Sequence, residues 1–211
     1  MKLKGDVILS KIRATILIGA ALAAAIPAIA QLPGAADPSR ITAGTYKVDP
    51  NHTQVVWTVN HMGITPLTGA FGASGGTLEL DPANPSAAKV TVTFTVADMS
   101  TTAPAFTKHL LSADFFEAEK YPTATFTSTA VKASGTTATI TGNLTLKGVT
   151  KPVTLNAKFF GAGANPRNKK TNVGFEATTT IKRGDFGIGY GLPMVPDPVE
   201  LRIYGAFESA S

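Results

Sequence analysis

Strict alternation of apolar and polar residues is the feature that most restricts how this chain can fold. In one segment, Val92, Phe94 and Val96 alternate with threonines. Successive side chains of a strand point to opposite faces of a sheet, so this pattern predicts antiparallel strands with one dry and one wet face. The segments that we expect to form strands are 53–62, 67–80, 89–98, 123–131, 137–146, 153–159, 173–182 and 199–208.

Turn residues and glycines favour closing these strands into a barrel. Lys147-Gly148 and the stretch from Asp81 to Pro85 fall between strand segments and are typical of turns. The four glycines of segment 67–80 indicate bulges or sharp coiling, as the corner of a barrel requires. A sandwich would also accommodate about eight short strands. We predict an all-β fold, an antiparallel β-barrel of about eight strands.

One segment in the middle of the chain interrupts the alternation. Phe106 and Leu110 lie one helical turn apart, and Phe115 and Phe116 follow closely. This spacing predicts a short helical insertion near residues 104–118. In a barrel such an insertion lies on a mouth or a seam, where it either closes a core or covers a cavity.

The inward faces of the predicted strands mix large and small apolar residues. Phe94, Phe126 and Phe175 are large, whereas Ala130 and Ala177 are small. Small inward residues leave volume for a ligand in a barrel of this size. They can equally oppose large residues in a filled core. Residue types alone leave both interpretations open.

Signs of catalysis or metal binding are sparse. The chain has no cysteine and no G-x-S-x-G motif. Its three histidines, His52, His61 and His109, lack the H-x-H or H-E-x-x-H spacing of metal sites. We therefore expect no catalytic residue and no metal site. An enzyme would have to use His61 or His109 as an acid or base beside Asp114 or Asp185, and this alternative stays open.

The N-terminus has the features of an export signal. Basic residues precede an apolar run at 14–29, and Ala28 and Ala30 fit the small-x-small cleavage rule. We predict a signal peptide over residues 1–30, with a retained membrane anchor as the alternative. Its removal takes away a net charge of +3, so the chain's +5 becomes +2. So weak a field does not recruit nucleic acid.

The rest of the chain divides into a leader and one domain. Residues 31–44 are rich in Pro, Gly and Ala without any period, which is typical of a disordered segment. Residues 45–211 have the length of a single domain and can bury a core unaided. Without cysteine, burial and the strand ladder must stabilise this domain in place of disulfides.

Several motifs follow one another along the chain between Tyr46 and Phe207. The first reads YKVDPNHT from Tyr46. The most specific begins at His109 and reads HL, then ADFF, then KYPTATF. GNLTLKGVTKPVT from Gly142 and IKRGDFG from Ile181 complete the set. Together these motifs resemble the YceI-like family of bacterial periplasmic proteins, also called polyisoprenoid-binding proteins.

The resemblance implies an extended, lipocalin-like barrel that holds a long isoprenoid, such as a quinone tail or a polyprenyl phosphate. It implies a non-catalytic periplasmic carrier with no cofactor other than the bound lipid. Nucleic acid is not an expected partner, membrane contact would be transient, and a homodimer is an open alternative. We expect the ligand to contact Phe94, Val96, Leu110, Phe115, Phe116, Phe126, Phe175 and Phe186, with Met62 and Met194 as adaptable additions.

Two adjacent positions depart from the family pattern. Family members often carry an Arg-Asp pair just before the helical His-Leu, where this chain has Phe106 and Thr107. This change removes a polar anchor for a ligand head group and suggests a different ligand. A structural or stress-response barrel with a filled interior and no ligand is the remaining alternative.

Overall fold

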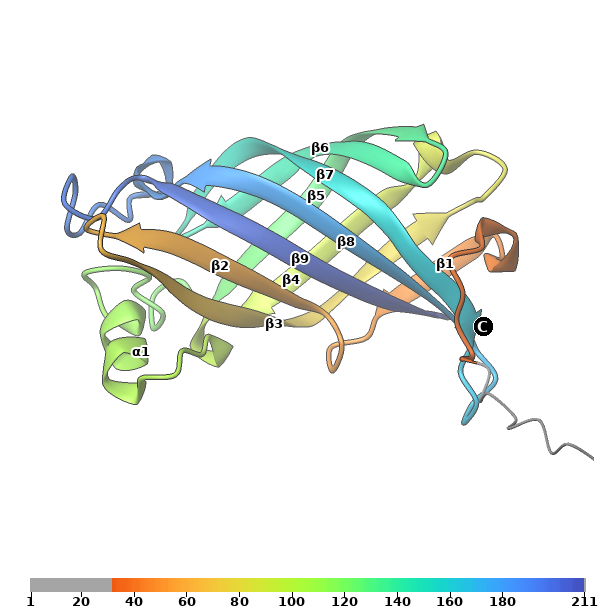
Figure 1. Cartoon of the computed structure of the whole chain (residues 1–211), viewed down its shortest axis with the longest axis horizontal. Coiled ribbons are helices and arrows are strands. Elements are labelled where there is room, and N and C mark those ends of the chain that lie inside the picture. The colour runs from red at the N-terminus through yellow and green to blue at the C-terminus, as the bar shows by residue number, and fades with distance from the viewer. Residues whose placement is uncertain (1–31, 211) are drawn as a thin grey trace, which may run out of the picture. The chain divides into compact units, whose positions relative to one another are not determined.

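The computed structural model of the protein describes residues 32–210. In this part of the chain, nine strands form one continuous antiparallel sheet (Figure 1). The predicted signal peptide, residues 1–30, lies outside the described residues. The strands are β1 (Gly44–Val48), β2 (Gln54–His61), β3 (Thr65–Leu80), β4 (Lys89–Thr95), β5 (Thr123–Ser134), β6 (Thr137–Leu146), β7 (Val149–Ala164), β8 (Thr171–Lys182) and β9 (Pro198–Ser209).

The sheet closes on itself because β3 pairs with β4 as well as with β2. Around the barrel the strands follow the order β3, β2, β9, β8, β7, β6, β5, β4. The short β1 shares the place of β2, since both strands pair with β3 and with β9, at different stretches of those strands. The result is a closed antiparallel barrel with eight strand positions, which confirms the predicted fold class.

A tight turn separates β1 from β2, and Thr53 repairs the strand ladder there. The Asp49 carboxylate accepts a hydrogen bond from the backbone N–H of Asn51 at 2.9 Å, which holds the turn. The buried Thr53 hydroxyl donates to the Ala206 carbonyl at 2.9 Å and accepts from the Ala206 N–H at 3.0 Å. The Thr53 side chain thereby satisfies the Ala206 N–H, and the Ala206 carbonyl also accepts a hydrogen bond from the Asp49 N–H at 2.9 Å. β1 and β2 therefore behave as one interrupted strand.

Side chains alternate between the interior and the outside as predicted, except at bulges. The pairing of β5 with β6 shifts by one residue between Ser128 and Ala130. Beyond this bulge, Val131 and Ala133 face the interior, whereas Ala130 is exposed. The prediction that Ala130 faces inward is therefore wrong, because one extra residue on a bulged strand reverses the alternation that follows it.

The mid-chain insertion joins β4 to β5 at one end of the barrel (Figure 1). Its helix α1 (Pro104–Leu111) begins at a proline, whose missing N–H would have no helical partner in the first turn. The helix ends at Leu111, with Ser112 as its C-cap, and two turns follow before β5, so the helix is shorter than the predicted insertion at 104–118. The remaining helical segments of the described residues are short 3-10 turns: η1 (Pro38–Arg40), η2 (Pro85–Ala87), η3 (Val96–Asp98) and η4 (Arg183–Phe186).

The segment predicted as a disordered leader, residues 31–44, is ordered in its described part. Residues 32–41, which we name the strap, lie against β7, where Ala35 and Ala162 exchange two backbone hydrogen bonds of 3.0 and 2.9 Å. Ile41 packs against the core, and β1 already begins at Gly44. The structure differs from the prediction here because the strap pairs with a distant strand, which local composition does not reveal.

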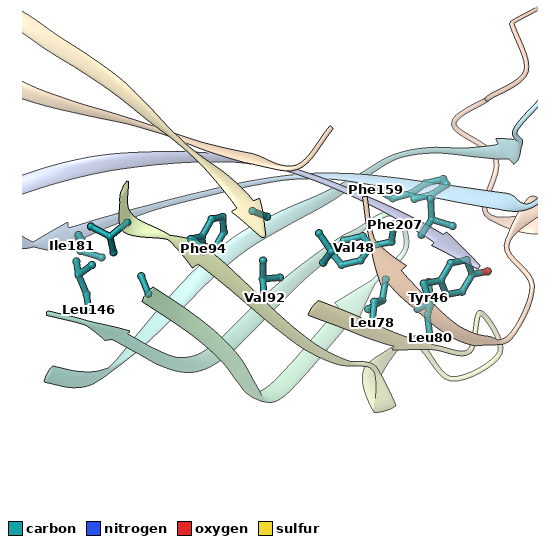
Figure 2. Close-up of a cluster of buried hydrophobic side chains, with 14 of the residues drawn as sticks. Tyr46, Val48, Leu78, Leu80, Val92, Phe94, Leu146, Phe159, Ile181 and Phe207 are labelled. Atoms are coloured by element: carbon teal, nitrogen blue, oxygen red, sulfur yellow. The ribbon is translucent and has the colours of Figure 1, made fainter. Parts of the chain in front are cut away.

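Buried side chains narrow the end of the barrel beside β1. Figure 2 shows Tyr46 and Val48 of β1 close to Leu78, Phe159 and Phe207. The ring of Phe175 meets the rings of Phe159 and Phe207 edge to face, with ring centroids 5.8 and 6.2 Å apart, respectively. In the described part of the chain, no helix has the length and apolar character needed to span a membrane.

Candidate binding cavity

The barrel encloses a cavity of about 580 Å³. Pro38 and Ile41 of the strap line it at one end, and Tyr190 and Val195 of the β8–β9 loop (residues 183–197) line it at the other. The cavity therefore extends along the barrel, and the interior is hollow instead of filled. Its volume lies within the roughly 300–1,000 Å³ that small-molecule pockets have. We call the end that carries α1, the β2–β3 turn and the β8–β9 loop the mouth.

The lining is almost entirely apolar because every strand turns its apolar face inward. In β9, for example, Val199, Leu201 and Ile203 line the cavity, whereas Glu200 and Arg202 are exposed on the outside. Such a wall excludes water and offers few hydrogen-bond partners, so burying a polar molecule in it would be costly. The chemistry of the lining therefore suits an apolar occupant.

Small residues on adjacent strands give the cavity its volume. Ala157 of β7 and Ala177 of β8 are cross-strand partners, and both line the cavity. Ala124 of β5 contributes a third small side chain. Larger residues at these positions would fill the space between the aromatic side chains. The mixture of large and small inward residues thus leaves room here, one of the two interpretations that the sequence allowed.

Most of the residues that we expected to contact a ligand lie on the cavity wall. Val96 and Phe186 are buried but lie outside the lining, because they belong to η3 and η4, where the strand alternation has ended. Met62 and Met194 are exposed on loops at the mouth and also lie outside it. A ligand-binding role stays a prediction for the six residues on the wall: Phe94, Leu110, Phe115, Phe116, Phe126 and Phe175.

Several aromatic residues of the lining were missed in the list drawn from the sequence, among them Trp57 and Phe71. Trp57 of β2 lies over Gly69 of β3, and a Cβ at Gly69 would come within 2.3 Å of the indole ring. Phe71 of β3 meets the ring of Phe116 at 5.4 Å, so it couples the insertion to the barrel wall. The alternation of segment 53–62 already placed Trp57 on the inward face and could have identified it.

An aromatic cluster at the mouth contains one of the predicted acid-base pairs. The His109 ring lies 5.1 Å from Phe115 and 5.2 Å from Tyr190, and all three residues line the cavity. His109 Nε2 lies 2.9 Å from a carboxylate oxygen of Asp114, and both side chains are about half exposed to solvent. Solvent therefore screens this pair, whose contribution to stability is small.

The other groups named for catalysis do not join this cluster. His61 lines the cavity at the end of β2, and Asp185 is exposed in η4. Across residues 32–210, no group of three or more histidine, aspartate or glutamate side chains is placed to hold a metal ion.

Arg183 fastens the β8–β9 loop over the mouth from within. Its guanidinium is buried and donates hydrogen bonds to the carbonyls of Ile188, Tyr190, Val195 and Pro196, at 2.6 to 3.0 Å. Burial lowers the pKa of this guanidinium, and the nearby carboxylate of Asp197 acts in the opposite direction. The four carbonyls occupy its N–H groups, so Arg183 serves to hold the loop and has little capacity left for a ligand.

A domain model described as "YceI-like domain" matches residues 46–207. The chain belongs to the YceI-like family. A YceI-like relative, Protein YceI of Salmonella arizonae, is 46% identical over 163 residues, which cover 76% of this chain and 85% of that protein.

Solved structures share the fold of this chain. BcnA of Burkholderia cenocepacia superposes with a TM-score of 0.65 at 28% identity, covering 75% of this chain and 98% of that one. A polyisoprenoid binding domain from Saccharophagus degradans, implicated in plant cell wall breakdown, superposes with a TM-score of 0.55 and covers 80% of this chain and 99% of its own. At 11% identity, this second similarity is one of fold alone.

The departure from the YceI-like pattern at 106–107 has a clear structural place. Phe106 of α1 lines the cavity at the mouth, where it extends the apolar wall. The Thr107 hydroxyl accepts a hydrogen bond from the Thr101 N–H at 3.1 Å and lies 2.9 Å from the Thr101 hydroxyl. One residue thus belongs to the cavity and the other fixes the start of the helix, so neither supplies a charge to a ligand head group.

Proposed function

We propose that this YceI-like barrel is a non-catalytic carrier or store of a long-chain isoprenoid or a similar lipid, held in the cavity. We propose further that it works in the periplasm after loss of residues 1–30. The observation that carries the proposal is the apolar cavity of about 580 Å³ that runs along the barrel. The polyisoprenoid binding domain of Saccharophagus degradans, which has the same fold, supports the choice of ligand class.

The energetics of an apolar wall favour a long ligand over a short one. Each buried CH₂ group contributes about 0.8 kcal/mol, whereas association costs on the order of 4–15 kcal/mol. A ligand of two isoprene units would gain roughly 8 kcal/mol, which falls within that cost. A longer chain exceeds it without any polar anchor, consistent with a wall that offers few hydrogen-bond partners.

A lipid-modifying enzyme is the competing function, and only the His109–Asp114 pair favours it. The pair lies at the rim of the mouth, and the side chains of both residues are partly exposed to solvent. Catalytic acids and bases are usually desolvated or held beside further polar groups that adjust their pKa. The ring neighbours of His109 are Phe115, which has no polar group, and Tyr190, whose ring meets the imidazole edge to face. We therefore favour the carrier.

Filling the cavity tests the proposal directly. In Ala177→Trp, the indole would occupy the part of the cavity that Ala157 and Ala177 line, so we expect the variant to lose both co-purifying lipid and the uptake of an added long-chain quinone. Thr178→Trp is the matched control, because Thr178 follows on the same strand and is exposed on the outside. Mass spectrometry of extracts measures the lipid, and circular dichroism checks the fold.

The two variants separate loss of binding from loss of folding. Overpacking the interior costs about 1–3 kcal/mol, which a stable barrel tolerates. A folded Ala177→Trp protein that carries as much lipid as Thr178→Trp would contradict the proposal, since the ligand would then lie outside the cavity.

A further inference from the structure

Exposed apolar side chains gather at the mouth of the barrel. Of the seven large hydrophobic side chains exposed in the described residues, five lie on two loops there. Ile64 is 78% exposed and Met194 is 66% exposed. The two loops are neighbours because β2, which leads into one, pairs with β9, which follows the other (Figure 1). The five residues are Met62 and Ile64 of the β2–β3 turn and Tyr190, Leu192 and Met194 of the β8–β9 loop.

Neither loop carries a charge at its tip. Residues 61–67 read HMGITPL, and residues 186–196 read FGIGYGLPMVP, without a single Asp, Glu, Lys or Arg. We name these two stretches the mouth tips. Exposed apolar patches of this kind mark interaction sites. An uncharged tip with aliphatic, methionine and tyrosine side chains fits the interfacial layer of a bilayer, where tyrosine is enriched and charged groups are costly.

Polar interactions behind the tips keep the apolar side chains pointing outward. Arg183 holds the β8–β9 loop from inside through four backbone carbonyls. In the β2–β3 turn, Gly63 N–H donates to the Asn60 side chain at 2.7 Å, and Ile64 N–H donates to the His61 carbonyl at 3.0 Å. Because these hydrogen bonds fix the backbone of both tips, their apolar side chains stay exposed and do not fold into the cavity.

The mouth tips are continuous with the cavity wall. His61, Tyr190 and Gly191 belong to the tips and also line the cavity. A surface that covered the tips would therefore face the cavity directly. At the other end of the barrel, the strap and the packed aromatic side chains narrow the interior. The mouth is thus the end at which an apolar ligand meets the least obstruction.

We propose that the mouth tips dock on the surface of a lipid bilayer, inserting their uncharged apolar side chains so that a lipid passes between bilayer and cavity without crossing water. This inference rests on the proposed carrier function and deepens it by naming the partner. Lys147 donates to the Gly187 carbonyl of one tip at 3.4 Å, and Asp185 and Asp197 flank that tip in the sequence, so charges of both signs lie nearby and no one-signed field attracts lipid head groups. Docking should accordingly depend on apolar insertion and respond weakly to salt.

Flotation with phosphatidylcholine vesicles tests the docking. The protein is taken as isolated from the exporting cells, with mass spectrometry confirming that wild type and variants share the same N-terminus. We expect wild type to float with the vesicles, at about 0.1 M and about 1 M salt alike. The double variant Ile64→Asp/Leu192→Asp should lower the partition coefficient by a factor on the order of ten or more, because two inserted apolar side chains become charged.

Phe160→Asp is the matched control for removing exposed apolar surface. Phe160 is 68% exposed and lies near the pairing of Ala162 with the strap, away from the mouth tips. This variant should float as wild type does. The lipid content of every protein, measured on the same samples by extraction, keeps docking separate from carriage. If the protein contains no lipid but floats in a way that depends on the mouth tips, this result would support docking and overturn the proposed carrier function.

Several results would overturn the docking proposal. Wild type that stays with the soluble fraction, or a double variant that floats equally well, would exclude insertion of the tips. Binding that needs added phosphatidylglycerol and disappears at high salt would show electrostatic attachment instead. A wild-type dimer that the double variant dissociates, without any vesicle binding, would assign the tips to a second copy of the chain.

Discussion

At the scale of single residues, Arg183 shows how this fold holds a loop over an apolar cavity. A buried cation is costly unless hydrogen bonds and nearby charge compensate it. Here the guanidinium donates to four carbonyls of its own loop, and the Asp197 carboxylate accepts a hydrogen bond from the Gly184 N–H at 2.7 Å beside it. The charge organises backbone groups that would otherwise face the cavity without partners.

Replacing Arg183 should therefore release the loop. In Arg183→Met the carbonyls lose their donor, and we expect the free energy of unfolding to fall by about 3 kcal/mol or more. Backbone amides of residues 187–196 should also exchange with solvent much faster. Urea denaturation and hydrogen exchange measure the two effects. Arg202→Met, at an exposed position of β9, is the control; equal effects of both substitutions would refute the anchoring role.

Tyr46 gives the structure a dependence on alkaline pH. Its ring is buried beside the strap, and its hydroxyl donates to the Thr42 carbonyl. Burial raises the pKa of the Tyr46 phenol. The folded state thus favours the neutral phenol more than the unfolded state does. Stability is fully present below the ordinary tyrosine pKa of about 10 and is lost as the pH rises beyond it.

The variant Tyr46→Phe should separate the hydrogen bond from the titration. Near neutral pH, loss of the bond to Thr42 should lower the free energy of unfolding by about 1 kcal/mol. Above a pH of about 10, stability should fall less steeply in the variant than in wild type, because the buried phenol is gone. Denaturant titrations across this pH range measure both slopes. Parallel curves would show that the alkaline loss comes from other groups.

At the scale of elements, regular strands were the most predictable part of the fold. Bulges and strand ends, where the regular alternation breaks, were the least predictable. Period-two alternation is local, so the sequence indicated the strands and their inward faces. The bulge at Ser128 and Ala130 depends on how β5 pairs with β6, so alternation could not locate it. Val96 and Phe186 lie outside the cavity wall for a similar reason, because a 3-10 turn replaces the strand at each of these residues.

The position of the strap against β7 could not be predicted from the sequence. Glycines of β7 allow the strap to approach closely. A Cβ at Gly163 would lie 2.2 Å from the Pro33 carbonyl oxygen, and one at Gly161 would lie 3.1 Å from the Ala35 carbonyl oxygen. The strap's own composition is that of a flexible segment. Its order follows from a surface on a strand far along the chain, where missing side chains allow two backbones to approach.

Gly163→Ala should displace the strap without unfolding the barrel. Because the added methyl group would meet backbone atoms, the pairing of Ala35 with Ala162 must shift or open. We expect trypsin to cleave after Arg40 faster, by a factor on the order of ten, as local opening exposes the strap. Gly72→Ala is the control, since a Cβ there meets open space in β3. Equal cleavage of both variants would show that the strap does not depend on this approach.

At the scale of the whole molecule, closure of the barrel could be predicted and its hollowness could not. Alternating strands joined by turns, with no cysteine to cross-link them, leave a closed ladder as the natural way to satisfy every edge. Whether the interior is filled depends on the summed volumes of all inward side chains. Ala157 and Ala177, which are cross-strand neighbours, reduce this summed volume at one place on the wall. Their pairing is seen only in the structure.

The same reasoning explains which site residues were found. Phe94, Phe126 and Phe175 were identified because they lie inside regular strands. The His109–Asp114 pair was identified as one of several alternatives, since both residues lie in one compact insertion. The mouth tips were not identified as a surface. Their two loops are more than a hundred residues apart in sequence, and only the pairing of β2 with β9 brings them together.

Native mass spectrometry of the protein isolated from the organism that makes it, followed by solvent extraction, would show whether the barrel carries a lipid. We expect a discrete added mass whose extracted fragments repeat at the spacing of isoprene units, and we expect this mass to be absent from Ala177→Trp. A bare protein mass, combined with failure to take up any added long-chain quinone or polyprenyl lipid, would exclude the carrier function and leave a barrel with an empty cavity.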